Sequence, residues 1–229
     1  LSDLFSRPSL KADTSRNAHA SSNFGVPQVS TMLLVVNEGT ATGSFGNVTC
    51  SLSGPSGEMD FIVPSINIPN PDSPYPLTQS FVGGALAPSE VFLNHINCVI
   101  DGLKANDADE FASLRDEVSR FFQSKPNFNC TDQFMNSRFK VPQSLAVKLD
   151  NFFDKQFNLK VADYTFIVTL RDLKGDWLTD VRKTVQVTDH VIERLQQQRQ
   201  LLKFGFGSIC PLPPNVAAEL VLSSAEVSQ

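Results

Sequence analysis

The chain has 229 residues, of which 41% are hydrophobic, and its formal net charge is -5. This apolar content is enough for a hydrophobic core and excludes a chain that is disordered throughout. Direct nucleic-acid binding is disfavoured as well, because the most charged stretch, residues 171–183, alternates in sign instead of presenting a basic patch.

Residues 1–30 are rich in Ser, Asn and Ala and poor in hydrophobic side chains. Such a segment buries too little apolar surface to fold alone, so we predict an extended N-terminal arm. Its anchors would be Leu4, Phe5 and Leu10. Ordering an arm costs roughly 1–2 kcal/mol of backbone entropy per residue. Something must therefore hold the arm, either the body of the same chain or, in the leading hypothesis, a neighbouring copy.

Residues 31–68 carry β-branched and aromatic runs separated by Gly-containing turns, which predicts a β segment with strands near 31–37, 43–52 and 58–64. The sequence PNPDSPYPL follows. Its prolines disfavour both helix and central strand, so residues 69–88 are predicted to be a connector.

Residues 89–204 are predicted to hold a central three-helix subdomain, then a β-hairpin and a last helix. Apolar residues recur with helical spacing from Pro88 to about residue 104, after Asp107, and after Ser144, which could cap the third helix. Alternation returns in residues 162–189, with a turn around Gly175, and predicts the hairpin. Thr188 or Asp189 then caps a helix that runs to about Lys203.

Residues 205–229 are predicted to form an extended C-terminal arm, because Gly205, Gly207 and three prolines oppose regular structure. Its anchors would be Leu220, Val221 and Leu222. The fold class expected for the whole chain is α+β, with β segments on both sides of the helices.

Four widely spaced cysteines, Cys50, Cys98, Cys130 and Cys210, include no CxxC pair and no Cys/His cluster, which excludes an obvious zinc or thioredoxin-type motif. They could form two disulfides in one of three connectivities, or remain as four buried thiols. Glycosylation sequons begin at Asn47 and Asn129, but about two are expected by chance in a chain of this composition.

No catalytic, cofactor-binding or metal-binding residue is predicted. Three histidines are available: His19 lies in the polar arm, His95 precedes Cys98 by three residues, and His190 follows a predicted helix cap. A Cys/His pair at 95 and 98 is conceivable on a helix, although packing is the more common role. The carboxylates of Asp107, Asp109, Glu110, Asp116 and Glu117 are explained by helix starts and exposed helix faces.

The leading hypothesis for function is a self-assembling structural subunit. No apolar run is long enough for a transmembrane helix. A first residue other than Met and a final Gln229 are typical of a chain cut from a polyprotein by a viral 3C-like protease. Together with the arms, these ends predict a subunit of a multi-copy assembly, such as a viral coat or virion protein, whose partners are copies of itself or sibling subunits. The alternatives are a secreted, disulfide-bonded binding or interaction protein, which would be extracellular, and an enzyme without a recognisable motif.

Overall fold

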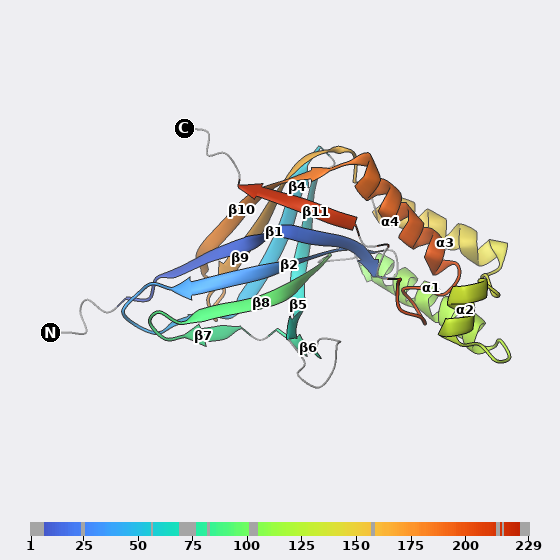
Figure 1. Ribbon diagram of the computed structural model, residues 1–229, viewed down its shortest axis with the longest axis horizontal. Coiled ribbons are helices and arrows are strands. Elements are labelled where there is room, and N and C mark those ends of the chain that lie inside the picture. The colour runs from blue at the N-terminus through green and yellow to red at the C-terminus, as the bar shows by residue number, and fades with distance from the viewer. Residues whose placement is uncertain are drawn as a thin grey trace.

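The computed structural model describes residues 7–23, 26–55, 57–68, 77–81, 83–100, 105–156, 159–213, 216 and 218–224 (Figure 1). The strands are β1 (Leu10–Asn23), β2 (Val26–Asn37), β3 (Gly43–Phe45), β4 (Asn47–Gly54), β5 (Gly57–Ile68), β6 (Leu77–Ser80), β7 (Gly84–Leu86), β8 (Val91–Ile100), β9 (Ala162–Arg171), β10 (Trp177–Val187) and β11 (Ala218–Ser224). The helices are α1 (Ala105–Gln123), α2 (Cys130–Asn136), α3 (Gln143–Gln156) and α4 (Asp189–Leu202). The mixed α+β class predicted from the sequence is confirmed.

Nine of the described strands form one antiparallel sheet in the order β4-β9-β10-β11-β1-β2-β8-β5-β6. The sheet closes on itself because β4 pairs with β5 as well as with β9. Strand β6 continues the sheet beyond β5, and β3 pairs with β7 in a separate two-stranded sheet. The helices gather at one end of the closed sheet (Figure 1).

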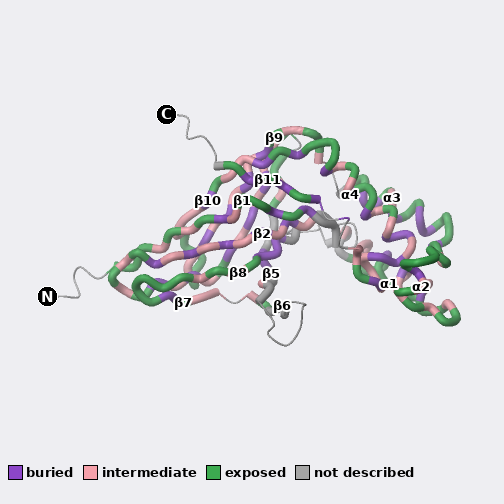
Figure 2. The backbone as a smooth tube through the Cα atoms, viewed as in Figure 1, coloured by how far each residue is buried: buried purple, intermediate pink, exposed green. Residues whose placement is uncertain are grey.

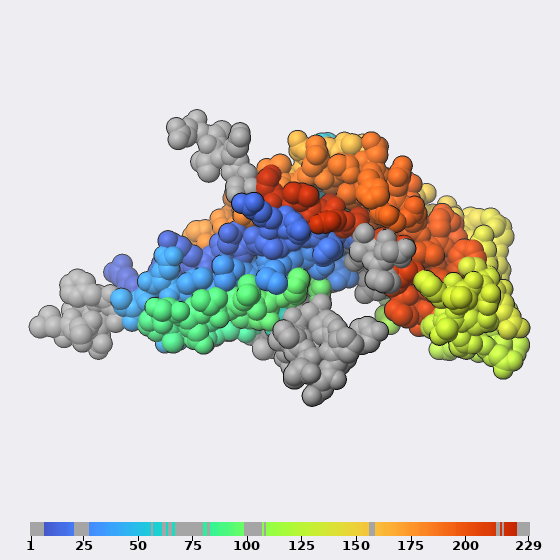
Figure 3. Space-filling model, in the orientation of Figure 1, coloured from blue at the N-terminus to red at the C-terminus, as the bar shows by residue number. Residues whose placement is uncertain are grey.

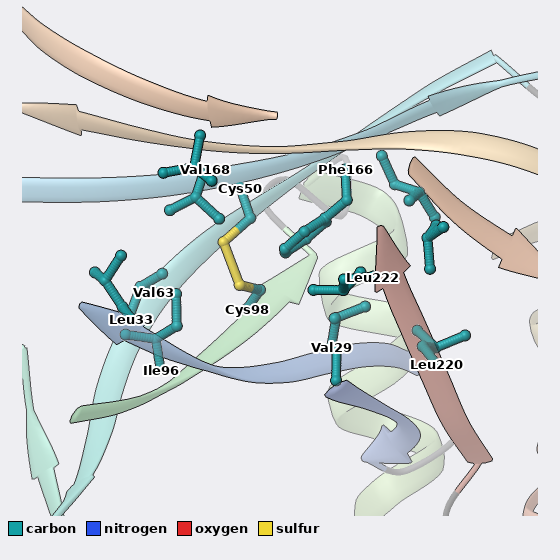
Figure 4. Close-up of a cluster of buried hydrophobic side chains, with 14 of the residues drawn as sticks. Val29, Leu33, Cys50, Val63, Ile96, Cys98, Phe166, Val168, Leu220 and Leu222 are labelled. Atoms are coloured by element: carbon teal, nitrogen blue, oxygen red, sulfur yellow. A yellow bond between two sulfur atoms is a disulfide. The ribbon is translucent and has the colours of Figure 1, made fainter. Parts of the chain in front are cut away.

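The interior of the closed sheet is a dry apolar core. Along β9, for example, Tyr164, Phe166, Val168 and Leu170 are buried and alternate with more exposed residues. Burial of each such side chain stabilises the fold by roughly 1.5–3 kcal/mol. A disulfide between Cys50 of β4 and Cys98 of β8 crosses this interior and joins two strands that β5 separates in the sheet (Figure 4).

A second core lies among the helices and includes Val118 and Phe122 of α1, Leu149 and Phe152 of α3, and Leu202 of α4. Figure 2 shows buried residues in this group of helices. Helix α4 belongs to both cores, because its first turns bury Val191 and Leu195 against the sheet. The second disulfide, between Cys130 and Cys210, fastens α2 to the segment that follows α4.

Both predicted arms differ from the structure, because the described residues of each one form strands of this chain's own sheet. Strand β1 pairs with β2 and β11, and β11 lies between β1 and β10. Leu220 and Leu222 are buried in the chain's own core, Leu10 packs against that core, and Val221 is exposed. Leu4 and Phe5 lie outside the described residues. Strand pairing and burial within one molecule are therefore enough to order these segments.

The helix predicted for residues 88–104 is wrong, because this segment forms strand β8. In the predicted connector, β6 and β7 are strands, and residues 69–76 lie outside the described part of the chain. The prediction for residues 162–203 is confirmed: β9 and β10 form an antiparallel hairpin, and Thr188 Oγ1 accepts a hydrogen bond from Val191 N at the start of α4. Ser144 lies in the first turn of α3 and does not precede that helix.

The buried side chain of Asn37, at the end of β2, holds three segments together. Its Nδ2 donates to Ala41 O (2.8 Å) and Leu86 O (2.9 Å), while its Oδ1 accepts from Ser9 N (3.2 Å) and Gly39 N (3.0 Å). Replacing Asn37 with Ala removes all four bonds and leaves backbone groups unsatisfied. The free energy of unfolding should fall by about 2–3 kcal/mol in urea titrations. The exposed Asn136 is the control, and an equal loss in Asn136→Ala would contradict this role for Asn37.

Candidate interaction surface

The structure does not bring the predicted histidine and cysteine candidates together. Cys98 is buried in its disulfide with Cys50, whereas His95 is exposed on the other face of β8. His190 is exposed and its ring accepts a hydrogen bond from Arg194 Nε at 3.5 Å. His19 is exposed on β1. No described histidine therefore faces a thiol that could act as a nucleophile.

The carboxylates at 107–117 lie on α1, as expected for a helix start and an exposed helix face. Glu117 forms an ion pair with Lys148 of α3 at 3.0 Å, and Glu110 forms one with Lys155 at 3.8 Å. Within the described ranges, no group of three or more His, Cys, Asp or Glu residues could hold a metal ion.

A hollow of about 870 Å³ lies beside α3 and α4. Its lining combines three carboxylates, three glutamines and an arginine with an apolar part formed by Leu201, Phe204 and Val216. The lining residues include no Ser, Thr, Cys or His in this described region.

Arg199 of α4 and Lys203, the residue that caps its C-terminus, fasten α4 to α3. Lys203 Nζ pairs with Asp150 Oδ2 at 2.8 Å, and Arg199 Nη1 pairs with Asp154 Oδ1 at 3.2 Å while Nη2 donates to Phe153 O at 3.0 Å. Burial lowers the pKa of the Arg199 guanidinium, and the charges of Asp154 and Asp150 oppose that shift. These pairs position two helices, so we assign them a structural role.

A different surface stands out on the outside of the sheet, where β2 and β8 run side by side (Figure 3). In the strand register Leu34 lies opposite Leu93 and Val36 lies opposite Val91. Val91 and Leu93 are 52% and 55% exposed. Met32 continues the row on β2. We name the surface formed by these five residues the apolar outer face.

The rest of the outside of the sheet is mostly polar. Across β4, β9 and β10 the outward positions are held largely by Ser, Thr and charged residues, with Ile167 as an exception. An antiparallel sheet with one wet side normally shows this alternation of apolar inward and polar outward residues. The apolar outer face departs from it, and an exposed cluster of this kind marks an interaction surface.

Charges of both signs border the apolar outer face on its β1 side. Lys11 Nζ pairs with Glu38 Oε2 at 2.6 Å, and Asp13 Oδ1 pairs with Lys183 Nζ at 2.7 Å. Burial raises the pKa of Asp13, but the hydrogen bonds from Lys183 and from Thr14 N lower it more, so the pKa lies below its ordinary value. The carboxylate therefore stays charged at neutral pH, and the border carries no large excess of either sign.

A sequence signal for this surface was present in the run of Leu33, Leu34, Val35 and Val36. A strand with apolar residues on both faces is typical of burial on both sides. Sequence reasoning used the run only to locate a strand. The structure shows that one of its two faces is uncovered by the described residues.

None of the helices in the described ranges is sufficiently long and apolar to span a membrane. A scan against models of protein families found no match, and neither did a search of curated proteins.

Proposed function

We propose that this chain is a disulfide-bonded interaction protein of an oxidising compartment, and that it docks on a second copy of itself through the apolar outer face. The observation that carries the proposal is the in-register set of outward Leu and Val side chains on β2 and β8. A gently curved sheet surface without a deep cavity suits a protein partner better than a small molecule.

The pairing of the cysteines supports the oxidising compartment. All four are paired, one disulfide lies in the core of the sheet and the other joins α2 to the segment after α4, and the described part of the chain has no free cysteine. Stable disulfides of this kind persist in secreted and other oxidising environments and are rare where thiols are kept reduced. This supports the secreted alternative from the sequence.

A second copy is the partner that this surface favours. Sheets pack face to face about 10 Å apart when their outward side chains interdigitate. The paired Leu and Val residues present the same apolar surface on both copies. A two-fold arrangement places one surface against itself, so a border of mixed charge allows the approach without strong repulsion. In this proposal the chain associates with itself through the outside of its sheet, and not through the terminal arms predicted from the sequence.

Leu93→Asp is expected to weaken self-association by about tenfold or more, because it buries a charge at the centre of the contact. Size-exclusion chromatography with light scattering over a concentration series measures the effect. Thr165→Asp, on the outward face of β9, adds the same charge on the other side of the sheet and should associate as the unmodified chain does.

The folded state should survive the change, since Leu93 is exposed in the single chain. Similar melting temperatures for the two variants would establish this. An unmodified chain that stays monomeric at every concentration would contradict the proposal, and so would Leu93→Asp protein that associates normally.

A larger assembly, such as a coat or virion, is the second candidate. A closed dimer uses one surface, whereas a shell needs a second one. Leu173 and Trp177 at the tip of the β9–β10 hairpin are both exposed and could supply it. A light-scattering mass above that of a dimer, reduced to the dimer mass by Trp177→Ser, would support this candidate.

A further inference from the structure

The sequon Asn47-Val48-Thr49 occupies the start of β4 in a geometry that suits attachment of a glycan. Val48 is fully buried in the core, so the side chains on either side of it, Asn47 and Thr49, point to the outside of the sheet. Asn47 is exposed. Among the described residues, its carboxamide has no hydrogen-bond partner.

A row of three outward residues begins at Asn47. Asn47 lies opposite Arg171 of β9, and Arg171 lies opposite Trp177 of β10. Side chains directly opposite in antiparallel strands are about 5 Å apart at Cβ, so Trp177 is only two such steps from Asn47. Trp177 is the single tryptophan of the chain and is 61% exposed. Nothing in the described fold accounts for this exposed ring.

The second sequon, at Asn129, differs because its carboxamide already serves the fold. Asn129 Oδ1 accepts a hydrogen bond from Asp132 N at 2.7 Å and caps the start of α2. The middle residue of that sequon, Cys130, is paired with Cys210. Asn129 thus has a structural role that Asn47 lacks.

We propose that Asn47 carries an N-linked glycan and that its first sugars lie across Arg171 against the ring of Trp177. The inference rests on the oxidising compartment of the proposed function, because oligosaccharide transfer and disulfide formation share the secretory route. A flat aromatic ring with one polar edge is suited to an amphipathic sugar surface.

The reaction requires a polyprenyl-diphosphate-linked oligosaccharide as the donor. The Asn47 side-chain nitrogen forms a bond to C1 of the first sugar, and the bond between C1 and the phosphate oxygen breaks. The electron pair of that bond leaves with the diphosphate, and a proton of the amide passes to a base of the transferase. No oxidant or reductant is involved.

The position of the glycan is compatible with the apolar outer face. In the closed order of the sheet, β9 and β2 are separated by three strands in either direction. A glycan rooted on β4 and directed over β9 therefore lies on the side of the molecule away from β2 and β8. It would cover the hairpin tip and leave the proposed docking surface open.

The test is secretion of the full chain, behind a signal peptide, from a eukaryotic cell line. Five forms are compared by intact mass before and after treatment with peptide N-glycosidase: the unmodified chain, Asn47→Gln, Thr49→Ala, Thr49→Ser and Asn129→Gln. The additional mass that the glycosidase removes should be absent from Asn47→Gln and Thr49→Ala. It should be present in Thr49→Ser, which preserves the sequon, and in Asn129→Gln.

Trp177 provides an independent reading. As the only tryptophan, it reports its own surroundings, and acrylamide should quench its fluorescence less in the glycosylated chain than in the enzyme-treated chain. Asn47→Gln protein should match the treated chain both before and after treatment.

Three failures are distinguishable. One result is secreted protein that resists thiol alkylation yet loses no mass on treatment with the glycosidase, or loses mass from Asn129 only. This result would contradict the glycan at Asn47 but not the oxidising compartment. Secreted protein with reactive thiols overturns the compartment itself. A glycan at Asn47 with unchanged quenching of Trp177 overturns the contact between sugar and ring.

Discussion

Replacing Cys130 and Cys210 together with alanine should lower the free energy of unfolding by about 4–5 kcal/mol, because this disulfide closes the longer loop of the two. The pair is separated by 80 residues in sequence. Without the bond, the unfolded chain gains the freedom that this loop closure removes. In the folded state, α2 and the segment after α4 would keep only their noncovalent contacts.

Guanidinium titration of the oxidised unmodified chain and of the double variant measures the difference, provided that both unfold with similar dependence on denaturant. The Cys50–Cys98 pair, separated by 48 residues, is the comparison. Its removal should cost slightly less by the same relation, at roughly 4 kcal/mol. A loss below about 1 kcal/mol for Cys130 and Cys210 would mean that the bond adds little to the stability of this fold.

Phe122→Ala is expected to cost about 3–5 kcal/mol, the range for removing a buried aromatic ring from a packed core. Phe122 is fully buried, and its ring centroid lies 5.1 Å from that of Phe121 and 5.2 Å from that of Phe128. Gly205 packs against the same ring with a φ of +91°, a backbone conformation that suits glycine. The turn after α4 is therefore shaped around Phe122, and the space left by the ring cannot close without moving this turn.

Phe134→Ala is the matched control, because Phe134 is 58% exposed and, among the described residues, its ring contacts the ring of Phe206. The same atoms are removed there, but little burial is lost, so about 1 kcal/mol or less is expected. Thermal and denaturant unfolding of the two variants gives the comparison. Equal losses would show that the helical core does not depend on close packing around Phe122.

The elements that were located correctly from the sequence are those whose apolar residues recur with a single period, either that of a strand or that of a helix. Residues 162–171 and 181–187 alternate on either side of a turn at Gly175, with Ile167 as an exception, so a hairpin was the structure that fitted best. The last helix has a side-chain cap at Thr188 and one apolar stripe. In both cases one face is buried and the other is largely exposed to solvent, so the apolar residues recur with a clear period along the sequence.

Strand β8 was predicted as a helix for the opposite reason. Both of its faces carry apolar residues, so Phe92 and Ile96 on the inward side and Val91 and Leu93 on the outward side do not alternate with polar ones. Any such run contains pairs with helical spacing by coincidence. The same property that hid the strand in the sequence leaves Val91 and Leu93 exposed on its outside, where we propose a docking surface.

The terminal segments were misjudged because the prediction considered each one alone. Ala18 and Ala20 of β1 are small, yet they are buried because β11 and β2 lie on either side of them. The partner strand comes from the far end of the sequence. Contacts of such long range leave no local signature, and neither the apolar outer face nor the row from Asn47 to Trp177 could be assembled without the register of the sheet.

The place of β11 between β1 and β10 has a consequence for biosynthesis. Until residues 218–224 leave the ribosome, the facing sides of β1 and β10 have no strand to pair with along that stretch. A nascent chain therefore holds two open hydrogen-bonding edges after residues 1–217 have been translated, and unpaired edges of this kind favour aggregation. Slow translation would lengthen this interval, and chaperones that shield extended segments would be most useful during it.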